Sequence, residues 1–325
     1  MKYKVIINAC SPSYKARAEE ILSFLQEHHL TSGNAAGYNE AIVFYAEEQK
    51  AEDIINRLPF KTFKMVRIKH YQPEIILTIL QELEIGSPAQ IYIFPGDSSG
   101  NELAVRFAWR LNGSSLVAVE KITIQDNALV GIKKVYSGNL RGAFIFNYKP
   151  YCFSLARGMS RFEADIPVEK KNYTFHDYSS KTISLQPHDY LESPKEEENK
   201  LEKSSFIIAA GRGTGNSMEI SRLQNIAREL GAELGVSRPV VMNAWAPLDQ
   251  LLGASGAVVS PDICLTLAVS GSPPFYYGIE KSKTIIAVNH DEHAPILKAA
   301  DIVIIDDYKK VIDTLIKLAA DEKGA

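Results

Sequence analysis

Hydrophobic and polar positions along the first hundred residues alternate in a pattern typical of strands that are each followed by a helix. Short apolar runs indicate strands, and longer stretches carry apolar residues at helical spacing. We expect strands at 5–7, 41–45, 64–68 and 90–94, and helices at 14–27, 51–58, 73–83 and 101–111. This alternation predicts a parallel sheet with crossover helices.

Between residues 115 and 183 the pattern changes to short strands joined by turns, which indicate antiparallel additions to the sheet. These strands are expected at 117–119, 122–124, 130–135 and 143–146. The polar, charge-dense stretch at about 186–203 indicates a linker or a solvated surface excursion at the domain boundary. The alternation then restarts, with strands at 206–210, 239–241, 263–269, 284–288 and 303–305, and helices at 217–230 and 308–320.

The sequence therefore predicts an α/β protein with two domains, each built on a mainly parallel sheet flanked by helices. Residues 1–200 are expected to form an N-terminal α/β domain with added antiparallel strands. Residues 204–325 are expected to form a Rossmann-like C-terminal domain. A length of 325 residues suits two domains of ordinary size.

Composition and charge limit the classes of binding partner and the cellular compartment that we expect. The net charge of −3 argues against a nucleic-acid or anionic-membrane surface. Three widely spaced cysteines form no disulfide framework and no metal-ligand spacing, which indicates a reducing compartment. The N-terminus enters a strand pattern without a signal-peptide core, and Pro273-Pro274 would break a membrane helix in the uncharged run 263–279. We expect a cytoplasmic protein with no direct membrane insertion.

Small, hydroxyl-bearing or cationic residues follow or interrupt the apolar runs of the second domain. These turns are Gly211-Arg212-Gly213, Val236-Ser237-Arg238, Gly253-Ala254-Ser255-Gly256, Val269-Ser270-Gly271 and Val288-Asn289. In an open parallel sheet such turns face one crevice, where nucleotides usually bind. Five of them within about eighty residues therefore predict a nucleotide site.

Each turn also has a structural interpretation. Arg212 could bind an anionic ligand, or simply face solvent in a tight turn, and Arg238 could bind the same kind of ligand or pair with a surface carboxylate. If a helix begins at Ser270-Gly271, its amide groups would suit a pyrophosphate. Asn289 and Asp307 could hold ribose or adenine, or cap a helix.

Motifs for covalent or metal chemistry are absent from the sequence. There is no Gly-x-Ser-x-Gly elbow, no Walker lysine turn and no His-Glu-x-x-His helix. The run His290-Asp291-Glu292-His293 implies no distant partner ligand, so we expect no metal site. The site is expected to bind a ligand, and we assign no catalytic residue.

The order and spacing of these turns resemble the alpha subunit of electron-transfer flavoprotein. The resemblance is closest over residues 211–318, where Ser260-Pro261, Ser282 to Asn289 and Ala294-Pro295 extend it. Upstream, Glu102-Leu103-Ala104 and Tyr136-Ser137-Gly138-Asn139 resemble the family's amino-terminal domain more loosely. The resemblance implies an electron carrier that binds FAD and pairs with a beta subunit holding AMP or a second FAD. It also implies a flavin dehydrogenase as donor and a quinone- or ferredoxin-linked acceptor.

The resemblance further implies which residues contact FAD. Arg212, Ser237 and Arg238 would lie near the isoalloxazine and the phosphate arm, and Ser255 replaces a threonine that addresses flavin N5. Ser270 to Phe275 would pass the pyrophosphate and the pyrimidine edge, while Asn289 and Asp307 would hold the adenosine. The expected cofactor-binding residues are Arg212, Ser237, Arg238, Gly253, Ala254, Ser255, Gly256, Ser270, Gly271, Ser272, Pro273, Pro274, Phe275, Asn289 and Asp307.

Two segments depart from the family pattern. Gly253-Ala254-Ser255-Gly256-Ala257 replaces the family's Gly-Gln-Thr-Gly-Lys, and Ser270 to Phe275 replaces Ser-Gly-Ala-Ile-Gln-His. Phe275 stands where the family has a histidine, so negative charge on a reduced flavin should be less well stabilised. The paired prolines also remove two backbone donors.

Two other functions remain open on the sequence. The chain could be an assembly subunit that holds another adenine nucleotide and has lost productive flavin binding. An NAD-dependent enzyme on a similar sheet is the third alternative, although the chain lacks Gly-x-Gly-x-x-Gly after its first strand.

Overall fold

The structure is a computed structural model that describes residues 2–28, 40–86, 88–126, 128–136, 138, 140–158, 171–181 and 200–323, with the backbone alone at 320–323. The chain forms two compact units, and the main division falls between residues 198 and 199. Residues 186–199 of the predicted linker lie outside the described residues, and Lys200–Lys203 form the short helix α5. None of the described helices has both the length and the apolar character needed to cross a membrane.

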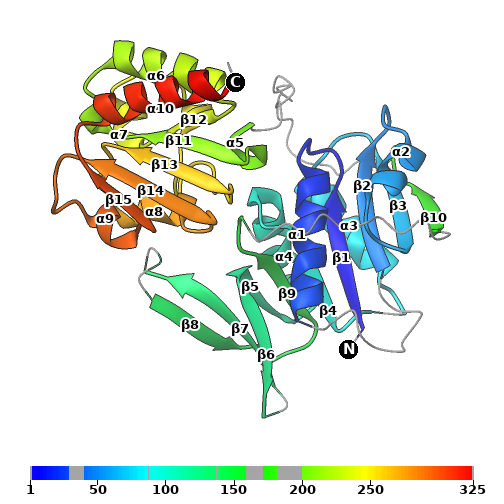
Figure 1. The fold of residues 1–325 in the computed structure, drawn as a ribbon. Helices are drawn as coiled ribbons and strands as arrows, with labels where there is room; N and C mark the ends of the chain where they lie inside the picture. Colours follow the sequence, from blue (N-terminus) through cyan, green and yellow to red (C-terminus); the bar gives the residue numbers. More distant parts are fainter. Residues whose placement is uncertain are drawn as a thin grey trace. The chain divides into compact units, whose positions relative to one another are not determined.

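The N-terminal unit is built on a seven-stranded sheet with helices on both faces (Figure 1). Its strands are β1 (Tyr3–Asn8), β2 (Glu40–Ala46), β3 (Thr62–Ile68), β4 (Ile91–Phe94), β5 (Ser114–Val119), β9 (Tyr151–Leu155) and β10 (Asn172–Asp177). They lie in the order β10-β3-β2-β1-β4-β9-β5, and every pair is parallel. The helices are α1 (Tyr14–Glu27), α2 (Ala51–Arg57), α3 (Pro73–Leu83) and α4 (Ser98–Arg110). One hydrophobic cluster lies under α1 and α2, and the other under α3 and α4.

A separate three-stranded sheet carries the predicted additions. It consists of β6 (Lys121–Gln125), β7 (Ala128–Val135) and β8 (Leu140–Ile145), and β6 pairs with β7 in antiparallel fashion. The antiparallel interpretation is wrong for residues 117–119, because they belong to β5, which pairs in parallel with β9. The strands β9 and β10 were not predicted.

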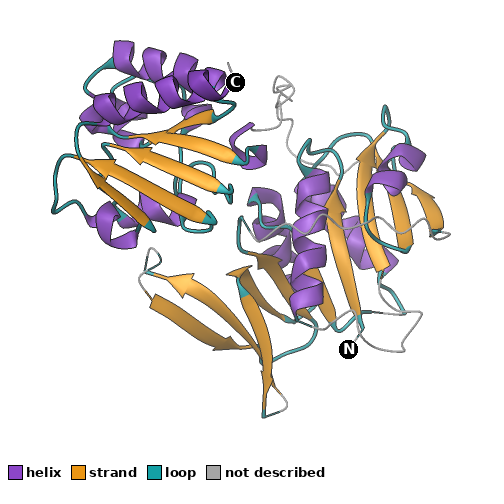
Figure 2. Ribbon diagram, viewed as in Figure 1, coloured by secondary structure: helices purple, strands orange, loops and turns teal. Residues whose placement is uncertain are grey.

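The C-terminal unit has a five-stranded parallel sheet between two layers of helices (Figure 2). Its strands are β11 (Phe206–Ala210), β12 (Glu233–Val236), β13 (Ile263–Leu267), β14 (Thr284–Asn289) and β15 (Ile302–Ile305). Its larger helices are α6 (Ser217–Glu229), α7 (Arg238–Met242), α8 (Pro273–Ile279), α9 (Pro295–Ala299) and α10 (Tyr308–Lys323), with short 3-10 turns at Arg212–Thr214 and Leu248–Gln250. Helices α6, α7 and α10 cover one face of the sheet, and α8 and α9 cover the other. This confirms the predicted α/β fold class.

One predicted strand of this unit is wrong. Residues 239–241 form part of helix α7, and the strand β12 lies just before them at Glu233–Val236. Pro239 has no amide hydrogen to donate to a sheet, but its fixed φ suits the first turn of a helix. Ser237 occupies the capping position of that helix, so the chain turns at the end of β12.

Candidate functional site

The chain reverses its winding direction between β11 and β13. The sheet order is β12-β11-β13-β14-β15, so the chain runs from β11 outward to β12 and then returns to the other side of β11. Ligands bind outside the carboxyl ends of the strands at such a switch point. Ala210 pairs with Leu267, and the Gly211 amide donates to the Leu267 carbonyl oxygen at 2.9 Å. The turns that follow β11 and β13 therefore start side by side.

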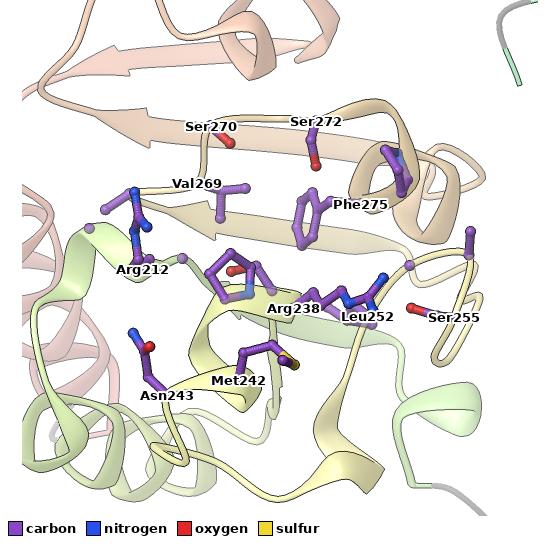
Figure 3. Close-up of a pocket in the computed structure, with 18 residues that line it drawn as sticks. Arg212, Arg238, Met242, Asn243, Leu252, Ser255, Val269, Ser270, Ser272 and Phe275 are labelled. Atoms are coloured by element: carbon purple, nitrogen blue, oxygen red, sulfur yellow. The ribbon is translucent and has the colours of Figure 1, made fainter. Parts of the chain in front are cut away.

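A cavity of about 620 Å³, the first chamber, opens at this switch point (Figure 3). The expected cofactor-binding residues in its wall are Arg212, Ser237, Arg238, Gly253, Ala254, Ser255, Ser270, Ser272, Pro274 and Phe275. The wall also contains Gly211, Gly213, Pro239, Met242, Asn243, Leu252, Ala268 and Val269. Ser270 and Ser272 lie along one side of the chamber, and Met242 and Asn243 along the other.

A second chamber of about 230 Å³ lies at the carboxyl end of β14. Its wall consists of Gly213, Thr214, Ala268, Val288, Asn289, His290, Asp306, Asp307, Tyr308 and Lys309. Asn289 and Asp307, which were expected at an adenosine site, both lie here. Gly213 and Ala268 belong to the walls of both chambers, so the two chambers adjoin.

The two chambers differ in charge. The first contains the guanidinium groups of Arg212 and Arg238, and none of the described residues in its wall is a carboxylate. Both arginines are exposed, and neither has an ion pair within the described part of the chain. The alternative that Arg238 pairs with a surface carboxylate is therefore not realised among these residues. The second chamber instead carries Asp306 and Asp307 beside Lys309.

Some backbone amides in the wall of the first chamber have no partner. The amides of Val269, Ser270 and Ser272, in the turn after β13, have no hydrogen-bond acceptor among the described residues. Helix α8 begins only at Pro273, and its two prolines carry no N–H. The next two amides, of Phe275 and Tyr276, both donate to the Ser272 carbonyl oxygen, at 3.0 and 2.9 Å. No helix begins at Ser270-Gly271, so the condition for a pyrophosphate site at a helix start is not met there, and the unpaired amides lie in the turn before the helix.

Comparison with known proteins agrees with this arrangement. A model of the electron transfer flavoprotein FAD-binding domain matches residues 200–280. The chain is 31% identical over 294 residues to YgcQ of Escherichia coli K12, named as an electron transfer flavoprotein subunit, across 86% of this chain and 97% of that protein. It is 26% identical over 250 residues to FixB of Salmonella typhimurium LT2, across 76% of this chain and 78% of FixB. The chain belongs to the electron transfer flavoprotein alpha-subunit family. The resemblance drawn from its turns is confirmed.

Phe275 of this alpha-type subunit lies in the chamber wall and in the hydrophobic core at once. Its side chain is only 5% exposed and belongs to the cluster that contains Leu252 and Val269. The neighbouring Pro274 carbonyl oxygen accepts a hydrogen bond of 2.8 Å from the Ala254 amide. The two segments that depart from the family pattern therefore touch and form one rim without charged side chains.

Asn289 and Asp307 are held by local hydrogen bonds. The Asn289 side chain is buried, donates to the Val269 carbonyl oxygen at 2.8 Å and accepts from the Asp291 amide at 3.1 Å. Asp307 accepts from the Lys309 amide at 2.9 Å, so its carboxylate caps the start of α10. Burial and a hydrogen bond to Glu219 raise the pKa of Tyr308, so its hydroxyl stays protonated, and the Glu219 carboxylate and the Thr214 carbonyl oxygen, each at 3.1 Å, share its one proton.

Three expected cofactor-binding residues, Gly256, Gly271 and Pro273, lie outside both chamber walls. Gly271 has φ +83°, and a Cβ there would lie 2.5 Å from the Ile296 amide nitrogen. A Cβ on Gly256 would lie 2.2 Å from the Leu251 carbonyl oxygen. These glycines permit close approach of the backbone and so shape the loops that bear the wall residues.

The wall residues Pro239, Met242 and Asn243 were missed because their segment was interpreted as a strand. Ser237 followed by Pro239 near the first helical position is the sequence signal for a helix start. That signal would have predicted α7 and placed Met242, whose side chain is 72% exposed, at the chamber.

Proposed function

We propose that this alpha-type subunit binds FAD across the two chambers and carries electrons between a flavin dehydrogenase and a downstream acceptor, in a heterodimer with a beta subunit. The observation that carries the proposal is the pair of adjoining chambers at the switch point, one cationic and one with carboxylates. A dinucleotide combines an anionic diphosphate with ribose hydroxyls that donate hydrogen bonds. The family model for the FAD-binding domain supports the same ligand.

The residues of the first chamber fit the anionic part of such a ligand. Arg212 and Arg238 would supply permanent positive charge, and the amides of Val269, Ser270 and Ser272 would supply hydrogen-bond donors. In the second chamber the carboxylates of Asp306 and Asp307 would accept from hydroxyl or amino groups. When bound, FAD would accept and donate the electrons, and the protein would position it and set its charge environment.

The test is the visible absorption spectrum of the full-length chain purified together with the beta subunit of its own organism. We expect a yellow complex with flavin absorption, and FAD as the nucleotide released on denaturation. A colourless complex that takes up no added FAD would overturn the proposal. Release of AMP or ADP without flavin would support the assembly subunit instead.

Replacing Phe275 with histidine is expected to raise the two-electron reduction potential of the bound flavin by about 30–60 mV. A charge-assisted hydrogen bond to an anionic reduced flavin is worth roughly 1.5–3 kcal/mol, and about 1.4 kcal/mol corresponds to 30 mV. The shift in reduction potential should be larger at pH 6 than at pH 8, because histidine loses its charge at about pH 6.5. Spectroelectrochemical titration measures it, with Phe275→Met as the neutral control. Equal potentials for the two variants would contradict the expectation.

A further inference from the structure

Two residues, Gly213 and Ala268, line both chambers. Gly213 follows β11 and Ala268 follows β13, so they meet at the switch point itself. A Cβ added to Gly213 would lie 2.9 Å from the Ala268 Cβ and 3.0 Å from its carbonyl oxygen. The Ala268 methyl group thus already occupies the space beside Gly213. These two residues therefore stand where the two chambers meet.

Ala268 carries its methyl group in a backbone conformation that favours glycine. Its φ is +50°, in the left-handed region, where a Cβ crowds the following carbonyl oxygen. Its amide donates to the Val288 carbonyl oxygen at 2.9 Å, which helps to hold this conformation. Its carbonyl group also lies close to the Gly211 backbone, because a Cβ added to Gly211 would lie only 2.1 Å from the Ala268 carbonyl oxygen. A glycine at 268 would adopt this conformation without strain, so the methyl group is retained at a cost in stability.

We infer that Ala268 and Gly213 form a steric constriction between the two chambers. The size of the side chain at position 268 then determines whether a dinucleotide or two smaller ligands bind. A small residue lets one dinucleotide span both chambers. A larger residue separates them into a site for an anionic flavin mononucleotide and a site for a neutral nucleoside. The inference rests on the proposed function, since it concerns how the same two chambers take FAD.

The test compares Ala268→Gly with Ala268→Asn in the full-length chain purified with its beta subunit and stripped of nucleotide. Glycine and asparagine both tolerate the left-handed region, so both variants relieve the strain of Ala268. Of the two, only asparagine adds side-chain volume beside Gly213, where the two chambers meet. We expect Ala268→Asn to weaken FAD binding by at least about tenfold, the effect of moderate overpacking. FMN and adenosine, the probes for the separate chambers, should each bind within about threefold of the wild type.

Ala244 provides the matched control. It is also a left-handed alanine, with φ +57°, and it lies outside both chamber walls. Ala244→Asn should therefore leave FAD affinity unchanged.

The constriction is overturned, while the proposed function stands, if Ala268→Asn binds FAD as tightly as the wild type does. The same conclusion follows if its affinities for FMN and adenosine fall by the same factor as its affinity for FAD. If the wild type takes up no FAD, both the proposed function and the inference of a constriction are overturned.

Discussion

Replacing Arg212 and Arg238 together with methionine is expected to weaken FAD binding by about 10²–10⁴-fold. Both side chains line the first chamber, and neither has an ion-pair partner among the described residues, so their charge is available to a ligand. A hydrogen bond to a charged group contributes roughly 1.5–3 kcal/mol, and two of them account for the expected range. Methionine preserves much of the apolar stem, so the loss reports the charge. Flavin fluorescence titration of the stripped complex measures the dissociation constant.

The control for this pair is Arg222→Met on α6. Arg222 pairs with Asp313 at 2.6 Å and with Glu219 at 3.5 Å, and it lies outside both chambers. It should leave the dissociation constant within about twofold, since an exposed ion pair contributes little. The loss caused by the double variant should also shrink at high salt, because screening weakens exposed charges. If the double variant binds FAD as tightly as Arg222→Met, the arginines do not contact the ligand.

Much of the fold was predictable because local patterns decide it. The helices at 14–27 and 73–83 match the predicted bounds, since each repeats apolar residues along one face. The strand β9 was missed because its neighbours β4 and β5 come from segments far upstream, and no local alternation marks a strand buried in such a sheet. The strand β12 was missed because it is only four residues long and contains Gly235.

The candidate site was predictable as far as strand ends determine it. Carboxyl ends of parallel strands meet at one edge, so turns such as Gly211-Arg212-Gly213 and Val269-Ser270-Gly271 lead to one crevice wherever the strands pair. The division into two chambers was not predictable. It depends on the close approach of Ala268 to Gly213, which only the register of β11 and β13 brings about.

The N-terminal unit contains a buried ionic network at the amino-terminal end of its sheet. Lys4 on β1 is 3% exposed and forms ion pairs with Glu84 and, at 3.6 Å, with Glu40. Glu84 is 4% exposed and also accepts hydrogen bonds from the Tyr92 hydroxyl and, at 3.3 Å, from the Ala89 amide. Burial and the contact with Glu84 raise the pKa of Tyr92, so its hydroxyl remains a donor. Lys4 is thus the cation that compensates a buried carboxylate.

Lys4→Met is therefore expected to lower the free energy of unfolding of the N-terminal unit by about 3–5 kcal/mol, because it leaves the Glu84 charge buried and unpaired. Hydrogen exchange of the β1 and β4 amides, followed by mass spectrometry as a function of urea, measures this unit in the full chain. Lys15→Met, which removes an exposed pair with Glu19 at 3.6 Å, should cost less than about 0.5 kcal/mol. The double variant Lys4→Met/Glu84→Gln should recover part of the loss, since glutamine is neutral and still accepts from Ala89 and Tyr92. A loss from Lys4→Met no larger than that from Lys15→Met would show that Lys4 is not the group that balances the charge of Glu84.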